Sequence, residues 1–471
     1  MNLSKKVALN TAIQIISKAI SIILGLVSIA IMTRYLGRDG FGEYTTIITF
    51  LSFFAVAADM GLTLVTVQMI SQPNINQDEV LSNLFSLRFF SAIGFLILAP
   101  LSIFLFPYSH SIKIGVVLVT ASFLFIALNQ ILVGLFQKNL RLDKVSIAEV
   151  VSRIILIIGV GLAAFLNLGL KGIIIATVLS SLISFILHYI FSLKFAKIKL
   201  NFNFKIWLSI LKKAWPISLT IIFNLIYLRA DTLILSLFKS QSEVGIYGAT
   251  YKVIDVLITV PFIFAGIILP IMTTSLINEP EKFKNIMQKA FDFMVIFSLP
   301  IFFGTQFLAK PVMVLVAGQD FAASGDVLKI LIGAASIIFI GTMFSHGVIA
   351  LDKQRKIIIG YVFTAITSLV GYLIFIPRYS YFGAAWVTIY SELIIALFSF
   401  YIVWKYSHFL PNIKILTKAL ISSLVMSLIL FLFKSLNLFL LLPLSISSYF
   451  IFLYLLKGIT KQDLLLITSK N

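Results

Sequence analysis

The sequence predicts an all-α protein that crosses a membrane about fourteen times. Of its 471 residues 60% are hydrophobic, and the mean hydropathy is +1.07, whereas a soluble domain is about half apolar. The apolar residues form long continuous runs, most of them near the ~20 residues that a helix needs to span a bilayer. Helices satisfy their own backbone groups in lipid. The short alternating segments of a membrane β-barrel are missing from the sequence.

Fourteen apolar runs are predicted as membrane spans. In chain order they cover residues 10–32, 44–66, 85–106, 114–136, 146–166, 172–193, 214–237, 245–270, 292–311, 327–350, 357–377, 383–404, 415–434 and 439–456. Most Lys and Arg residues between spans fall on one side of the membrane, which predicts that both termini are cytoplasmic. The N-terminal MNLSKKVALN leads into a full-length run without a small-residue cleavage site, so we interpret it as a retained first helix.

The composition excludes several classes of function. Most of the net charge of +19 is explained by Lys and Arg residues on the predicted cytoplasmic side of the membrane, so nucleic acid is not an expected partner. The absence of cysteine excludes disulfides, thiolate chemistry and cysteine-ligated metals. The four histidines are far apart, and no nucleotide-binding motif is found in the sequence. We therefore expect no metal site and no cofactor. No predicted outside loop is large enough for a catalytic domain, so an enzyme is not expected.

Two halves of the chain resemble each other. Phe41–Tyr44 (FGEY) matches Val244–Tyr247 (VGIY), and Leu142–Lys144 (LDK) matches Leu351–Lys353 (LDK), at a nearly constant offset. Gly, Thr and Ser recur in the same order in the sixth and twelfth spans. This pattern predicts two pseudo-symmetric six-helix bundles, as in transporters with parallel repeats. The expected parts are an N-terminal bundle (1–193), a basic cytoplasmic linker (194–213), a C-terminal bundle (214–404), and two additional transmembrane helices with a cytoplasmic tail (405–471).

The chain also resembles a known family. The resemblance is carried by TRYLGRDGFGEY after the first span, AADMGL at Ala57–Leu62, and the WPISL…LRADTLIL…EVGIYGATYKV block that starts at Trp215. These segments are similar to the Wzx-type polysaccharide flippases of the multidrug/oligosaccharidyl-lipid/polysaccharide exporter superfamily. The resemblance implies movement of an undecaprenyl-pyrophosphate-linked oligosaccharide from the cytoplasmic to the periplasmic leaflet of a bacterial inner membrane. The product would be O-antigen of lipopolysaccharide or another surface polysaccharide.

Cations inside the predicted spans are the candidate substrate ligands, because they match the phosphates of such a lipid. Six are present: Lys18, Arg88, Arg153, Arg229, Lys252 and Lys329. Acids three or four residues away predict structural ion pairs for three of them. These pairs are Glu149–Arg153, Lys252–Asp255 and Asp326–Lys329.

Lys18, Arg88 and Arg229 lack such a neighbour and are the first candidates for binding pyrophosphate, with Arg153 and Lys252 as further candidates. Ser17-Lys18 also resembles the Ser-Arg pair in the first helix of the lipid II flippase, with a point charge in place of a guanidinium fork. For Arg88 two other interpretations stay open, a side chain that extends to the headgroups and an ion pair with Asp59.

The expected mechanism is alternating access driven by an ion gradient, the membrane potential or consumption of the product. Asp59, Asp231 and Asp255 are candidate coupling sites for a proton or sodium ion. Further expected partners are membrane lipid, a polysaccharide polymerase and a chain-length regulator. Two alternatives stay open. One is a cation-coupled multidrug exporter of the same superfamily, which intramembrane acids would favour; the other is a membrane polysaccharide polymerase or ligase.

Overall fold

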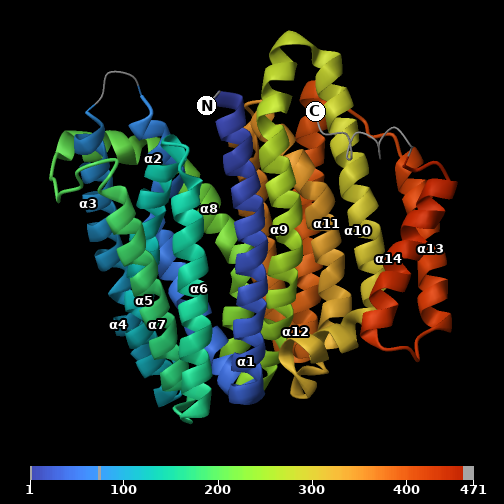
Figure 1. The fold of residues 1–471 in the computed structure, drawn as a ribbon, viewed down its shortest axis with the longest axis horizontal. Helices are drawn as coiled ribbons and strands as arrows, with labels where there is room; N and C mark the ends of the chain where they lie inside the picture. The colour runs from blue at the N-terminus through green and yellow to red at the C-terminus, as the bar shows by residue number, and fades with distance from the viewer. Residues whose placement is uncertain (1–2, 73–75, 460–471) are drawn as a thin grey trace. The chain divides into compact units, whose positions relative to one another are not determined.

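The computed structural model describes residues 3–72 and 76–459, which are almost entirely helical and contain no β-strand within these two ranges (Figure 1). The long helices are α1 (Leu3–Asp59), α3 (Gln77–Leu96), α5 (His110–Lys138), α6 (Leu142–Phe165), α7 (Gly169–Ser192), α8 (Phe204–Phe238), α9 (Gln241–Asn278), α10 (Pro280–Ala317), α11 (Ser324–Ala350), α12 (Gln354–Ser407), α13 (Lys414–Leu432) and α14 (Leu438–Leu455). Short elements are α2 (Leu62–Ile70), α4 (Leu98–Ser102), η1 (Ile103–Leu105) and η2 (Gln319–Phe321).

Two of the long helices each contain a break. Within the described ranges, twelve helical stretches are long and apolar enough to cross a membrane. In α1 the backbone leaves the helical region at Gly37 (φ 64°, ψ −172°), and in α12 at Ser380 (φ 53°, ψ −137°). These breaks separate predicted spans 10–32 from 44–66 and 357–377 from 383–404. The predicted all-α architecture with about fourteen spans is therefore confirmed.

Several helices begin where the sequence supplies a capping side chain. Asn76, Ser109, Asn203 and Asn437 each accept a hydrogen bond from a backbone amide in the first turn of α3, α5, α8 and α14. Such caps satisfy amides that have no partner within the helix. In α3 the acids Asp78 and Glu79 also lie in the first turn, where the helix dipole favours negative charge.

The chain packs as two compact units. The first contains the described residues of Met1–Gly248 together with Val316–Asp320, and the second contains those of Ala249–Leu315 and Phe321–Asn471. The short segment 316–320 is tied to the first unit by Arg34, whose Nη1 donates to the carbonyl of Val316 at 3.3 Å. The predicted division of the chain at 194–213, which rests on the sequence repeat, stays a prediction.

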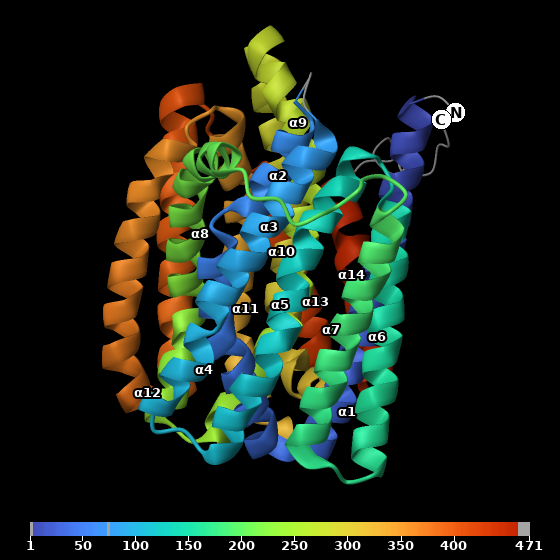
Figure 2. The same ribbon diagram turned by 90° about the vertical axis from the view of Figure 1, so that its left-hand side faces the viewer.

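In the first unit, α3, α5, α6 and α7 run side by side (Figure 2). The basic segment that follows α7 lies against α3 in an extended form. Backbone amides of Lys199, Asn201 and Asn203 donate to side-chain oxygens on α3 at 3.2, 2.8 and 2.8 Å. The acceptors are Ser82, Ser86 and Asn83. Alternate amides are thus satisfied by α3, and the predicted linker is fixed to the bundle before α8 begins.

The two glycines of the repeated motif pack directly on each other. A Cβ on Gly42 would lie 1.7 Å from the carbonyl oxygen of Gln241, and a Cβ on Gly245 would lie 2.1 Å from that of Arg38. Gln241 and Arg38 each precede the other glycine by about one helical turn, so the contact is reciprocal. Thr46 Oγ1 also donates to Gln241 Oε1 at 2.7 Å. Close backbone crossings of this kind need small residues.

In the second unit, a core of Met and Phe side chains from α10 and α11 continues to the C-terminal helices. It includes Met287, Met294, Phe339 and Met343, and reaches Tyr449 of α14. Tyr449 donates a hydrogen bond to the carbonyl of Ile296 on α10 at 2.8 Å. Helices α13 and α14 lie side by side (Figure 1). The two C-terminal spans outside the sequence repeat therefore share the core of this unit.

Candidate functional site: a buried ion pair at a helix break

The chain leaves the helix at the end of α1, inside the first unit. Met60 (φ 46°) and Gly61 (φ 73°) adopt left-handed conformations between α1 and α2. A side chain at Gly61 would also bring its Cβ to 2.8 Å from the carbonyl oxygen of Ala214 on α8. Glycine is therefore required by both the backbone angle and the close approach of α8. The predicted continuous span over 44–66 is wrong at this point, since the helix is interrupted at 60–61.

The break places Asp59, the last residue of α1, beside Arg88 of α3. Arg88 Nη1 lies 2.7 Å from Asp59 Oδ1, and the two side chains are only 2% and 11% exposed. This confirms the open interpretation of Asp59 as the partner of Arg88. It contradicts the alternative of an arginine that extends to the headgroups, because such a side chain would be exposed.

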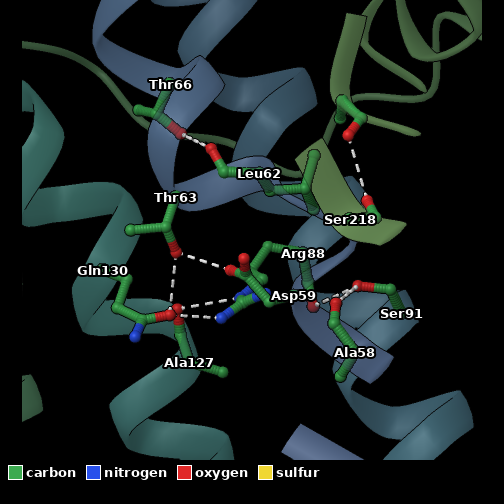
Figure 3. A network of polar contacts seen from close by, with 11 residues as sticks. Ala58, Asp59, Leu62, Thr63, Thr66, Arg88, Ser91, Ala127, Gln130 and Ser218 are labelled. Carbon is green, nitrogen blue, oxygen red and sulfur yellow. Dashed lines mark hydrogen bonds and ion pairs between the residues drawn. The ribbon is translucent and has the colours of Figure 1, made fainter. Parts of the chain in front are cut away.

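Polar groups from two further helices complete the network (Figure 3). Arg88 Nε donates to the carbonyl of Ala127 on α5 at 3.1 Å, and its Nη2 donates to Gln130 Oε1 on the same helix. Thr63 Oγ1 on α2 lies 2.5 Å from Asp59 Oδ1 and 3.0 Å from Gln130 Oε1. Four helices thus contribute to one polar network around the guanidinium, and the opposite charges of Arg88 and Asp59 neutralise each other in a place that water reaches poorly.

The network was only partly predicted from the sequence. The sequence points to Asp59 and Arg88, but not to Thr63 and Gln130. Thr63 follows Asp59 by four residues and shares its side of the chain, although the helix break makes that spacing unreliable. Gln130 is an amide within a predominantly apolar run, at a depth where an unsatisfied amide is costly, and this is the signal that could have identified it.

Asp231 forms a second buried carboxylate site in the first unit. It lies on α8 and is completely buried. Tyr247, the last residue of the second glycine motif, donates its hydroxyl to Asp231 Oδ2 at 2.7 Å. Thr232 donates its hydroxyl to Oδ1 at 3.1 Å. The motif tyrosine therefore links the start of α9 to the acid of α8.

The remaining predicted residues have different surroundings. The predicted pair Asp326–Lys329 is confirmed at 2.9 Å, with both side chains partly exposed. Glu149 and Arg153 form no ion pair in the described structure, and Arg153 is exposed, so that predicted pair is wrong. Lys18 is exposed on α1. Three further candidates are half-buried: Arg229 on α8, and Lys252 and Asp255 on α9. Their roles stay predictions.

The described residues contain no cluster of three or more His, Asp or Glu side chains that could hold a metal ion. The Asp59–Arg88 network can hold α1, α2, α3 and α5 together by a buried ion pair and its hydrogen bonds. It can also exchange that pairing for another anion if the helices separate, since guanidinium binds carboxylate and phosphate in the same geometry.

Comparison with known protein families gives one extended match. A family model described as "Polysaccharide biosynthesis protein" matches residues 31–326. Over 207 residues the chain is 23% identical to the "Probable low-salt glycan biosynthesis flippase Agl15" of Haloferax volcanii. That match covers 44% of this chain and 44% of the relative, so the chain matches less than half of the relative's length.

Solved structures share the fold over nearly the whole chain. The lipid II flippase MurJ in its inward closed conformation has a TM-score of 0.77 and 19% identity, and the match covers 93% of this chain and 97% of MurJ. An inward-facing multidrug resistance MATE family transporter of the MOP superfamily has a TM-score of 0.70 and 15% identity, covering 82% and 94% of the two chains. At these identities the similarity establishes the fold alone.

Proposed function

Because the chain belongs to the polysaccharide biosynthesis protein family and has the fold of MOP superfamily transporters, we propose that it flips a lipid-linked oligosaccharide between membrane leaflets. The observation that carries this proposal is the family match over residues 31–326. The named activity of the Haloferax relative, a glycan biosynthesis flippase, is of the same kind. The sequence resemblance to polysaccharide flippases is thereby confirmed at the level of the family.

The substrate that we propose is an undecaprenyl-pyrophosphate-linked oligosaccharide repeat unit. Its head carries a diphosphate and sugars, whereas its tail is hydrocarbon. A protein that moves such a head through lipid must offer positive groups within the spans, because an isolated charge in hydrocarbon is costly. Lys18 and Arg229 supply such charges in the first unit, and Lys252 supplies one in the second. The reaction forms and breaks no covalent bond.

Arg88 takes a different place in the proposal from the other cations. It is already paired with Asp59 and fully enclosed, so it is available to a phosphate only after the network opens. We assign it first to holding the N-terminal helices together. Arg153, which is exposed and has no ion-pair partner in the described residues, is the more accessible of the secondary candidates.

The proposed direction is from the cytoplasmic to the outer leaflet of a bacterial inner membrane, with both termini cytoplasmic and the export of O-antigen or another surface polysaccharide as the outcome. This rests on the distribution of Lys and Arg between spans. A coupling ion, a polysaccharide polymerase and a chain-length regulator would be the functional partners.

Purified protein in vesicles tests the proposal with a fluorescent undecaprenyl-pyrophosphate oligosaccharide and a membrane-impermeant quencher. Lys18→Gln and Arg229→Gln should each lower the initial flipping rate about ten- to a hundredfold, since a charged hydrogen bond is worth about 1.5–3 kcal/mol. Lys329→Gln is the matched control, because Lys329 is a cation of the second unit that is not among the proposed substrate ligands and forms a partly exposed ion pair with Asp326. Wild-type rates in both charge variants would refute the role of these residues, and no flipping by the wild type would refute the function.

Multidrug export is the second candidate function. The observation that favours it is the fold shared with MATE transporters together with the buried acid Asp231. Carboxylates attract cationic drugs. Efflux of a cationic dye from cells that express the protein, compared with cells that lack it, separates this function from lipid flipping.

A further inference from the structure

The second unit contains a buried carboxyl group that none of the interactions described above involve. Glu392 lies on α12, after the break at Ser380, and is 7% exposed. Its Oε1 is completely enclosed and has no hydrogen-bond partner. No Lys, Arg or His side chain of the described residues forms an ion pair with it. Asp59, by contrast, has Arg88, and Asp231 has two hydroxyl donors.

The first segment of α12, before the break at Ser380, carries further polar groups without partners at the same depth as Glu392. A Cβ on Gly360 would lie 2.9 Å from the ring of Phe398, and a Cβ on Gly371 would lie 3.1 Å from Val387. These contacts show that the two segments of α12 run antiparallel, so residues near the midpoint of one face those near the midpoint of the other. Thr364 and Ser368 therefore lie at the level of Glu392.

Both hydroxyl groups at this level are enclosed. Thr364 and Ser368 are completely buried, and neither hydroxyl oxygen has a hydrogen-bond partner. Tyr361, one turn before Thr364, is close enough to interact electrostatically with Glu392. On α11, a helix packed on α12, the titratable groups are Asp326 and Lys329, which pair with each other near its start, and His346, whose Nδ1 lies 2.9 Å from the carbonyl oxygen of Thr342. The surroundings of Glu392 are thus polar but contain no paired cation.

An ionised carboxylate cannot be accommodated cheaply in such a place. Without a counter-ion or strong donors, the cost of burying its charge is large, and the group takes up a proton instead. The neutral acid has one O–H group, which it can donate to a hydroxyl oxygen such as those of Thr364 and Ser368. The hydroxyl oxygen that accepts this hydrogen bond would then have a partner.

We propose that Glu392 is the proton-binding site of the second unit, neutral in the conformation described here, and that it carries the proton which drives transport. The proton joins a carboxylate oxygen when the side chain meets water on one side of the membrane and leaves when it meets water on the other side. The buried state between these two holds the acid in its neutral form. The coupling part of this inference rests on the proposed flippase function; the protonation of Glu392 does not.

Infrared spectroscopy of the purified full-length protein tests the protonation directly. At pH 7 the wild type should show the carbonyl band of a buried carboxylic acid. Glu392→Gln should remove this band, and Glu392→Asp should keep an acid band at a shifted frequency. Glu149→Gln is the matched control, because Glu149 is an intramembrane acid that is only half-buried. An unchanged band in Glu392→Gln overturns the proposal.

Flipping in vesicles tests the coupling. A pH gradient should accelerate flipping by the wild type and by Glu149→Gln, whereas Glu392→Gln should flip at the same rate with and without the gradient. A response of Glu392→Gln equal to that of the wild type overturns the coupling, as does a wild type that flips but ignores the gradient. If the wild type does not flip at all, the proposed function fails, and the infrared band by itself then decides whether Glu392 holds a proton.

Discussion

Replacing Arg88 by Gln should destabilise the first unit far more than replacing an exposed arginine. The change leaves Asp59 charged and enclosed, with the hydroxyl of Thr63 as its nearest described donor. It also removes the donors to Ala127 and Gln130. Breaking a buried ion pair by removing one partner costs about 3–5 kcal/mol. Arg141→Gln is the control, because Arg141 and Asp143 form a partly exposed pair at 2.9 Å, which should contribute about 0–1 kcal/mol.

The double variant Asp59→Asn/Arg88→Gln isolates the interaction itself. Both groups are then neutral and can still form hydrogen bonds, so its loss of stability should be smaller than the sum of the two single losses by about 1–3 kcal/mol. Unfolding in mixed detergent micelles, followed by the fluorescence of the four tryptophans, measures each loss. If the losses simply add, or if Arg88→Gln costs no more than Arg141→Gln, the buried pair is not what holds these helices together.

Two other positions give sharp expectations. Gly42→Ala should abolish correct folding, because its Cβ would lie 1.7 Å from the carbonyl oxygen of Gln241. Gly25→Ala is the control, since its Cβ would meet nothing within 4 Å, and it should behave as the wild type in size-exclusion chromatography. Equal behaviour of the two variants would contradict the close backbone crossing at Gly42. Tyr247→Phe should cost about 1–3 kcal/mol in the same unfolding assay, because a fully buried Asp231 loses a donor. Adding Asp231→Asn should recover part of that loss, and a double variant less stable than Tyr247→Phe would argue against this reason.

The number and order of the spans could be predicted because that information is local. Lipid offers no partner for backbone amides, so an apolar run of sufficient length has to be helical. The breaks near Gly37 and Ser380 were also placed correctly, since polar residues interrupt the apolar runs there. The interruption at Met60–Gly61 is not predicted, because a single glycine within a long apolar run does not show that α8 passes close to it, with the carbonyl oxygen of Ala214 2.8 Å from where a Cβ on Gly61 would lie.

The candidate sites depended much less on local pattern. Spacing along one helix correctly predicted Asp326–Lys329, where the two side chains meet within one turn. The same rule failed for Glu149–Arg153 and could not choose a partner for Arg88. Whether two side chains on one face of a helix meet depends on their rotamers and on the polar groups of adjacent helices. The spacing of residues along the sequence gives no information about either.

The sequence alone determined that this chain is a helical membrane protein with many spans, which orientation in the membrane its basic residues favour, and which family it resembles. Only the tertiary structure decided that Asp59 forms an ion pair with Arg88, that Gly42 lies against the helical turn before Gly245, and that Oε1 of Glu392 is enclosed without a hydrogen-bond partner. The physical reason is the range of the forces concerned. Transfer into lipid is set by the composition of one segment, whereas the neutralisation of a buried charge is set by helices distant in the chain that only packing brings together.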